Sequence, residues 1–150
     1  MEEIRTQDLD EMLKGVKVEE LTSFTKDIAQ YIERGDKAFY YYVKDVLDSK
    51  NIQLKEMYAR ADVSESYGSK IISMVKHTKD RDLIIRFCLG GHFNLDETNR
   101  ALKLYGYSPL YSKNKRDVII IVAINNRCYQ ISDVNSMLID AGFDALIKNN

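Results

Sequence analysis

Hydroxyl and ammonium side chains gather between residues 64 and 81, where their types and spacing suit binding to a polyanion. Serine and tyrosine hydroxyls can bond to phosphate oxygens or base edges, and lysine and arginine neutralise phosphate charge. From Lys70 to Arg81, four basic side chains accompany one acid, Asp80. The candidate contacts to double-stranded DNA are Ser64, Glu65, Ser66, Tyr67, Ser69, Lys70, Lys76, Lys79 and Arg81.

Other chemistry-bearing residues do not converge in the sequence. Cys88 and His92 have the four-residue spacing of metal ligands on a helix, but Gly90 and Gly91 should break a helix between them. His77 lies in a polar loop, and no nucleophile, base and orienting group form a recognisable set. Neither known glycine-rich phosphate-binding pattern is present. We therefore expect no enzyme activity, no metal site and no cofactor.

Composition indicates one globular, water-soluble chain. Of its 150 residues, 45% are hydrophobic and 30% are charged, which suffices for a core of ordinary size. No apolar run approaches the roughly 20 residues that a membrane span needs, and the acidic N-terminus lacks the features of a signal peptide. The two cysteines form no disulfide framework. We expect a cytoplasmic, reduced protein with no membrane partner.

Charge is distributed unevenly along the chain, whose net charge is −1. Residues 1–36 carry 5 basic and 10 acidic side chains, a net charge of −5, whereas residues 37–82 and 83–150 each have a net charge of +2. We interpret the first part as an acidic helical extension exposed to solvent. The alternative is a segment that contacts a protein partner or masks a basic face.

The elements that must position the candidate contacts are helices, because apolar residues recur every three or four positions. This spacing predicts helices over residues 8–14, 19–34 and 37–50, the last with Asp36 as its N-cap. The apolar face of the 19–34 helix consists of Leu21, Phe24, Ile28, Tyr31 and Ile32. That of the 37–50 helix consists of Phe39, Val46, Leu47 and either Tyr42 or Val43.

Two short helices and a turn carry the candidate contacts themselves. The first is predicted over residues 53–61, the turn at Asp62 and Val63, and the second over residues 65–75 with Ser64 as its N-cap. The first helix should bury Leu54, Met57, Tyr58 and Ala61. The second should bury Ile71, Ile72, Val75 and either Tyr67 or Gly68.

An internal repeat fills the second half of the chain. Residues 81–110 align with residues 116–146, at an offset of 35 residues that becomes 36 after one insertion. Matching pairs are Arg81-Asp82 with Arg116-Asp117, Asn99 with Asn135, Gly106 with Gly142, and Gly90-Gly91 with Asn125-Asn126. Since glycine and asparagine tolerate left-handed backbone, the last pair should end the first helix of each copy. Asn94 and Glu97 form a capping-box pattern at the next helix, so each copy is predicted to be a helical hairpin.

The stretch Val43–Leu89 resembles the Xre/Cro-type, lambda-repressor-like helix-turn-helix family. The similarity lies in the order of a first helix, a short positioning helix, the Val63-Ser64 turn, a recognition helix with Ile71 in its core, a basic loop and a fourth helix. Residues 39–146 as a whole are similar to helix-turn-helix proteins of Gram-positive bacteria that have a tyrosine in the recognition helix and a two-hairpin tail. The sequence departs from the family at Leu54, Tyr58 and Asp62, where a glutamine, a small residue and a glycine are usual.

Together these features predict an all-α fold, in which a lambda-repressor-like helix-turn-helix bundle is extended by two repeated helical hairpins. The expected parts are the extension 1–36, a helix-turn-helix domain 37–111 that includes the first repeat hairpin (81–110), and a second hairpin 112–150 packed on the same core. The resemblance implies a dimeric transcriptional regulator whose recognition helix, residues 65–75, enters the major groove of DNA. The alternative is a helical adaptor that keeps this fold without sequence-specific DNA binding. It would contact a protein through the acidic extension or the C-terminal hairpins.

Overall fold

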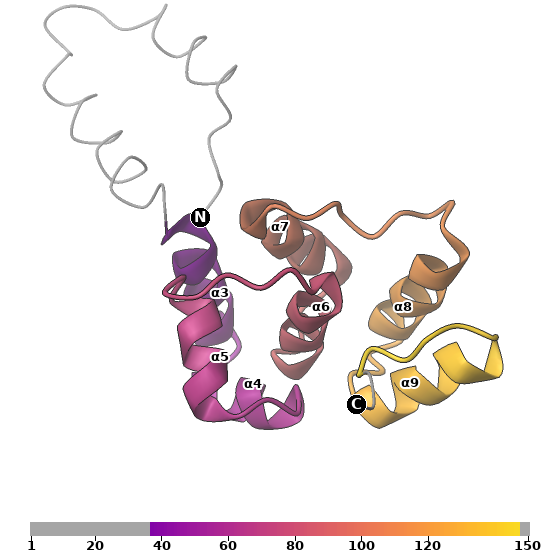
Figure 1. The fold of residues 1–150 in the computed structure, drawn as a ribbon, viewed down its shortest axis with the longest axis horizontal. Helices are drawn as coiled ribbons and strands as arrows, with labels where there is room; N and C mark the ends of the chain where they lie inside the picture. The colour runs from indigo at the N-terminus through magenta and orange to yellow at the C-terminus, as the bar shows by residue number, and fades with distance from the viewer. Residues whose placement is uncertain (1–36, 148–150) are drawn as a thin grey trace, which may run out of the picture.

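Seven α-helices and no strands make up residues 37–147, the part of the chain that the computed structural model describes (Figure 1). They are α3 (Ala38–Ser49), α4 (Leu54–Arg60), α5 (Glu65–Ile72), α6 (Arg81–Gly90), α7 (Leu95–Tyr105), α8 (Lys115–Asn125) and α9 (Ile131–Asp140). The all-α class is therefore confirmed for these residues. The helices predicted over 8–14 and 19–34, and the N-cap Asp36, lie outside the described residues. None of the described helices is long and apolar enough to cross a membrane.

Helix α6 is the centre of the core. It packs against α4, α7 and α9, and every residue from Leu83 to Gly90 except Arg86 is buried. Figure 1 shows α3, α4 and α5 on one side of α6, and the pair α8–α9 on the other. Helix α3 contributes Val43 to the core and leaves Tyr42 half-buried, which decides between the two predicted alternatives.

The two copies of the repeat are two helical hairpins, α6–α7 and α8–α9, and they are closed in the same way. The side-chain oxygen of Asn99 accepts a hydrogen bond from the Leu110 N–H at 2.9 Å, and that of Asn135 accepts one from the Leu146 N–H at 2.7 Å. The second helix of each hairpin is followed by a left-handed glycine, Gly106 (φ +107°) or Gly142 (φ +86°). The predicted capping box of Asn94 and Glu97 is confirmed.

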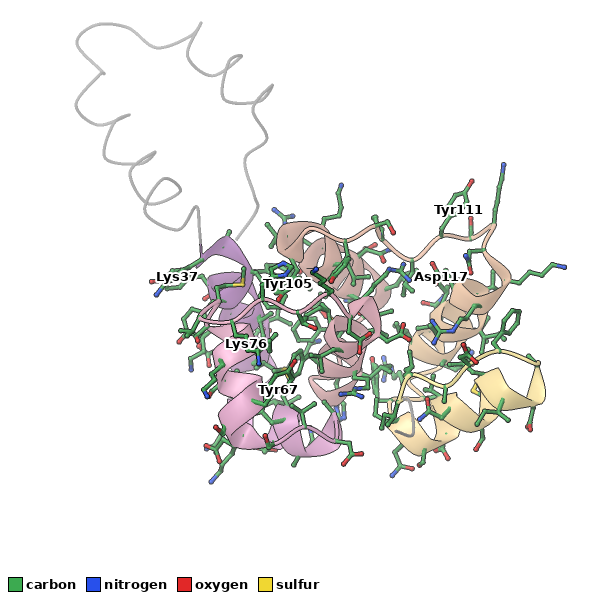
Figure 2. The ribbon with its side chains drawn as sticks, in the orientation of Figure 1. Lys37, Tyr67, Lys76, Tyr105, Tyr111 and Asp117 are labelled. Carbon is green, nitrogen blue, oxygen red and sulfur yellow. The ribbon has the colours of Figure 1, made fainter. Side chains whose placement is uncertain are left out.

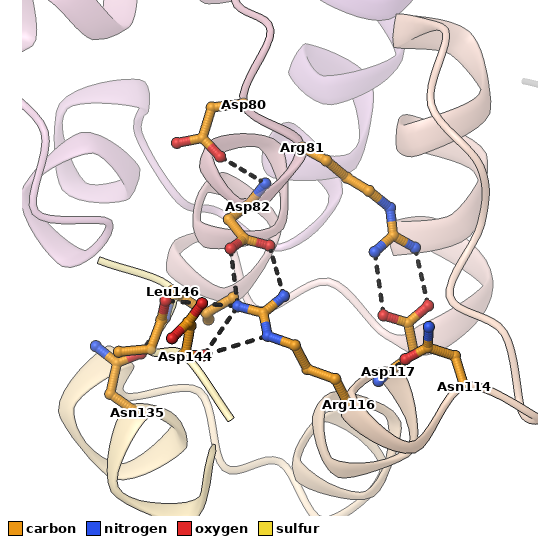
Figure 3. A network of polar contacts seen from close by, with 10 residues as sticks. Asp80, Arg81, Asp82, Asn114, Arg116, Asp117, Asn135, Asp144 and Leu146 are labelled. Carbon is orange, nitrogen blue, oxygen red and sulfur yellow. Dashed lines mark hydrogen bonds and ion pairs between the residues drawn. The ribbon is translucent and has the colours of Figure 1, made fainter. Parts of the chain in front are cut away.

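The Arg-Asp dipeptide that opens each hairpin binds the dipeptide of the other hairpin (Figure 3). The Arg81 guanidinium donates to both carboxylate oxygens of Asp117 at 3.1 and 3.0 Å. The Arg116 guanidinium donates to both oxygens of Asp82 at 3.0 and 2.8 Å. Asp117 is buried, so these crossed pairs hold the hairpins together with fixed geometry as well as with charge.

The same two arginines also close the far end of each hairpin. Arg81 donates to the backbone carbonyls of Ser108 and Pro109, and Arg116 donates to those of Asp144 and Ala145. Both sets of acceptors lie just after the second helix of their hairpin. Arg81 therefore joins the start of α6 to the segment after α7 and to the second hairpin. Arg116 likewise joins the start of α8 to the segment after α9 and to the first hairpin.

The predicted ends of α6 and α8 are wrong in one respect. Gly91 and Asn126 have negative φ, and the left-handed residues are the next ones, His92 and Arg127, each with φ 57°. The glycines of α6 serve close packing instead. A Cβ on Gly90 would lie 2.6 Å from the backbone oxygen of Met57, so glycine allows α4 and α6 to approach closely.

Candidate nucleic-acid interface

Helix α5 is held in place by local interactions that the sequence predicts. Asp62 takes the left-handed conformation (φ 58°) in the turn after α4. Ser64 is extended, and its hydroxyl accepts a hydrogen bond from the Tyr67 N–H at 3.2 Å. The predicted turn and N-cap are thus confirmed, and they fix where α5 begins.

The inner face of α5 is anchored by one close contact. Gly68, Ile71 and Ile72 are buried, which resolves the choice between Tyr67 and Gly68 in favour of the glycine. A Cβ on Gly68 would lie 2.7 Å from the ring of Tyr58, which also meets Phe87 edge to face with ring centroids 6.1 Å apart. Only a glycine at position 68 therefore accommodates the large Tyr58. Leu54, predicted to be buried, is half-buried.

The outer face of α5 is open along its length. All of Glu65, Ser66, Tyr67, Ser69 and Lys70 are exposed. The Ser69 hydroxyl donates to the carbonyl of Ser66 at 3.0 Å, which leaves its oxygen free to accept a bond from another donor. The ring of Tyr67 is 36% exposed, and the Lys76 ammonium lies 5.2 Å from its centroid (Figure 2). This cation–π contact places an aromatic ring and a positive charge side by side.

Helix α5 is shorter than predicted. It ends at Ile72 rather than Val75, because Met74 takes a left-handed conformation (φ 67°) and the Lys76 N–H bonds to the carbonyl of Lys70 at 3.0 Å. The chain turns away from the core at this point, and Val75 is 77% exposed instead of buried. The basic residues Lys76 and Lys79 therefore lie on a loop and not on the helix.

Two tyrosines at the end of α7 hold this loop. The Tyr105 hydroxyl accepts a hydrogen bond from the buried Thr78 N–H at 2.7 Å, and the Tyr107 hydroxyl donates one to the Thr78 carbonyl at 2.7 Å. The imidazole of His77 stacks on the ring of Tyr105, with centroids 4.7 Å apart. Burial raises the pKa of Tyr105 above its ordinary value, which further favours the protonated hydroxyl in this contact. Sequence reasoning missed both tyrosines, and their spacing carries no signal that links them to position 78.

Arg81 does not belong to the candidate interface, and its inclusion among the DNA contacts is corrected. Its guanidinium nitrogens bond to Asp117 and to the carbonyls of Ser108 and Pro109. A phosphate could reach this guanidinium only by displacing the bonds that join the two hairpins. The candidate interface keeps the other predicted residues, which lie at the N-cap of α5, on α5 and on the loop after it: Ser64, Glu65, Ser66, Tyr67, Ser69, Lys70, Lys76 and Lys79.

A second group of chemically active side chains lines a hollow of about 530 Å³ beside α4 and α9. Asp62, His92 and Ser132 are among its lining residues, but no hydrogen bond joins any two of them in the structure. Burial, with the charges of Arg60 and Lys50, lowers the pKa of His92. Among the described residues, no three His, Cys, Asp or Glu side chains could hold a metal ion. The thiol of Cys88 is buried, which raises its pKa.

No protein-family model, curated protein or solved structure matches this chain. The residues themselves therefore carry the functional argument.

Proposed function

We propose that this protein is a DNA-binding regulator in which α4 and α5 form a helix-turn-helix unit and α5 enters the major groove. One observation carries the proposal. Helix α5 presents an open polar face of Ser66, Tyr67, Ser69 and Lys70, while its opposite face is fixed in the core by Gly68. A recognition helix needs this combination of free side chains and a rigid base. The resemblance of Val43–Leu89 to lambda-repressor-like proteins supports the same assignment.

The contacts divide into two kinds. Lys70 on α5, with Lys76 and Lys79 on the loop after it, would neutralise backbone phosphates and set the position of the helix. Ser66, Tyr67 and Ser69 would face base edges, and Glu65 could accept a bond from the amino group of a cytosine. Two such units, one from each subunit of a dimer, would bind half-sites about one DNA turn apart.

The alternative is a helical adaptor that does not bind a specific DNA sequence. Glu65 favours it, because this carboxylate lies exposed on the presumed DNA face and repels phosphate. Val122 also favours it, since an apolar side chain that is 46% exposed suits contact with a protein.

Fluorescence anisotropy with labelled duplex fragments at low salt tests the DNA-binding proposal. We expect binding that weakens steeply with salt, and the double variant Lys70→Ala/Lys76→Ala should bind about tenfold more weakly or worse. Its salt slope should be smaller by about 2, because two phosphate neutralisations are lost. The matched control is Lys113→Ala/Lys115→Ala, which removes the same charge from exposed positions at the start of α8.

Equal effects of the two double variants would leave only non-specific charge attraction, and no rise in anisotropy at micromolar protein would refute DNA binding. Purification of the protein from its native host distinguishes the helical adaptor from the DNA-binding regulator. A DNA-free, stoichiometric protein partner would support the adaptor, and its absence would count against it.

A further inference from the structure

The surface at the end of α5 combines apolar and basic side chains. Val75 is 77% exposed, the side chain of Tyr67 is 36% exposed, and Met74 is half-buried. Lys76 belongs to the same surface, because its ammonium lies 5.2 Å from the centroid of the Tyr67 ring. We call Tyr67, Met74, Val75 and Lys76 the α5-end surface.

Contact with DNA accounts for only part of this surface. Phosphate oxygens and base edges bind hydrogen-bond donors and positive charge, which Tyr67 and Lys76 supply. Val75 lies on the loop that is expected to contact phosphates, yet its side chain can neither donate a hydrogen bond nor neutralise charge. An apolar partner would remove Val75 and Met74 from water, so the surface also suits a partner with an apolar face.

The first 36 residues of the chain join the described part beside the α5-end surface. Phe39, in the first turn of α3, meets the ring of Tyr105 edge to face with centroids 4.8 Å apart. His77, on the loop after α5, stacks on the same ring at 4.7 Å. The start of α3 and this loop are therefore neighbours. In Figure 2, Lys37 and Lys76 accordingly lie on the same side of the molecule.

We propose that residues 19–34 dock on the α5-end surface as an amphipathic helix and compete with DNA for it. The sequence predicts a helix in this segment, and its apolar stripe consists of Leu21, Phe24, Ile28, Tyr31 and Ile32. A helix of 16 residues would be about 24 Å long, and α5, with eight residues, is about 12 Å long, so the segment can cover α5 and the loop after it. The docking is independent of DNA binding, and the competition rests on the proposed function.

The attachment of the segment selects this surface. Residue 34 precedes Lys37 by three positions, so their Cα atoms lie at most about 11 Å apart. Gly35, in the link, can adopt the backbone conformations of a tight reversal, which would direct the helix back along α5. A short tether also gives a high effective concentration of the segment, so modest affinity suffices.

Charge complements the contact. The exposed basic residues around the α5-end surface are Lys37, Lys70, Lys76 and Lys79. Asp80, which follows them in the chain, is the N-cap of α6. Residues 19–34 carry four acidic and two basic side chains, a net charge of −2, and residues 1–36 together have a net charge of −5. Opposite charge favours this segment, whereas a second copy of the same surface would bring lysines together.

Hydrogen exchange of the whole chain without DNA, read by mass spectrometry over residues 19–34, tests the docking. We expect these amides to exchange about tenfold or more slowly than in an unstructured chain. Val75→Asp should abolish this protection, because it places a negative charge in the apolar contact and opposite an acidic segment. The matched control is Val122→Asp, the same change at a valine that is 46% exposed on α8, and it should retain the protection. Thermal melts establish that both variants remain folded.

Fluorescence anisotropy with labelled duplex DNA tests the competition. Phe24→Asp/Ile28→Asp disrupts the apolar stripe and should release the segment. Because the α5-end surface is then always accessible, we expect about fivefold tighter binding or more, although the variant carries two additional negative charges. The control Ser23→Asp/Gln30→Asp adds the same charge on the opposite side of the predicted helix, and it should not bind more tightly than the native chain.

The two measurements fail separately. Exchange of residues 19–34 at the unprotected rate in the native chain, or equal exchange in Val75→Asp and Val122→Asp, would overturn the docking. If the docking is observed but Phe24→Asp/Ile28→Asp binds DNA no more tightly than the native chain, the competition is overturned. If no variant binds DNA, the proposed function is refuted and the competition with it, while hydrogen exchange still decides the docking.

Discussion

The hairpins α6–α7 and α8–α9 share one sequence pattern but occupy different environments. Helix α6 lies between α4, α7 and α9 and is buried on nearly all sides. Helix α8 has a more apolar sequence than α6, yet Val122 is exposed where Phe87 is buried. The difference comes from α3 and α4, which pack on α7 and α6 of the first copy and not on the second copy.

The residues of the repeat therefore fall into two groups, those that are the same in both copies and those that differ. Two polar features recur in both copies: the Arg-Asp dipeptide, which links the copies, and the asparagine that closes each hairpin. Residues that face α4 do not recur, and Gly90 is replaced by Asn125. The residues that recur in both copies therefore make the contacts within and between the hairpins. The residues that differ face the other parts of the chain.

The largest effect is expected from breaking the crossed ion pairs. Asp117→Ala leaves Arg81 without its carboxylate and removes the acceptor of the Tyr111 N–H, so we expect a loss of about 3 kcal/mol in the free energy of unfolding. Asp82→Ala should cost less, about 2 kcal/mol, because the Asp82 side chain is 16% exposed and that of Asp117 is 7% exposed. Urea unfolding measures both.

The control for this pair is Asp140→Ala, which removes an exposed carboxylate at the end of α9. We expect it to change stability by no more than about 0.5 kcal/mol. If Asp117→Ala matched this control, the crossed pairs would contribute nothing to joining the hairpins.

The second effect concerns the position where the copies diverge. Gly90→Ala would place a Cβ 2.6 Å from the Met57 carbonyl oxygen, so α4 must shift and we expect a loss of about 2 kcal/mol. Asn125→Ala, at the matching and exposed position of α8, should stay within about 0.5 kcal/mol of the native protein. Thermal unfolding of the two variants checks the difference. Equal losses would mean that close packing on α4 does not distinguish the copies.

The smallest effect is expected from removing the asparagine that closes each hairpin, a feature that both copies share. Asn99→Ala and Asn135→Ala each remove the acceptor for one backbone N–H, that of Leu110 or Leu146. We expect each variant to lose about 1 kcal/mol, with nearly equal values for the two copies. Denaturant midpoints at unchanged slope measure the loss. A cost in only one copy would show that the two hairpins are closed by different means.

Local signals in the sequence predicted much of this fold. Ser64 caps α5 and Asn94 with Glu97 caps α7, because capping depends on residues three positions apart. The repeat predicted two hairpins in the right places. The helical part of the candidate interface was also predictable, since its exposed residues alternate with the apolar positions of a single helix.

The features that the sequence did not predict depend on contacts between residues that are far apart in the chain. Arg81 has the residue type and position of a phosphate contact, and only the packing of the second hairpin turns it toward Asp117. The loop after α5 is held by Tyr105 and Tyr107, which bond to Thr78 from positions 27 and 29 residues further along the chain. Of the left-handed residues, Arg127 is a type that rarely takes this conformation and His92 one that takes it more often. Gly91 and Asn126, which precede them, also tolerate it, so local preference did not single out the correct positions.

The crossed Arg-Asp pairs have a consequence for the origin of this architecture. Each hairpin carries both a donor and an acceptor for the other, so the pairing is self-complementary. A single hairpin with one Arg-Asp dipeptide could form the same two bonds with an identical hairpin across a two-fold axis. Duplication and fusion of such a unit would then preserve both bonds within one chain, while leaving each copy free to acquire different neighbours. Where the two hairpins meet, they are paired like the two subunits of a symmetric dimer, but their outer faces have different neighbours.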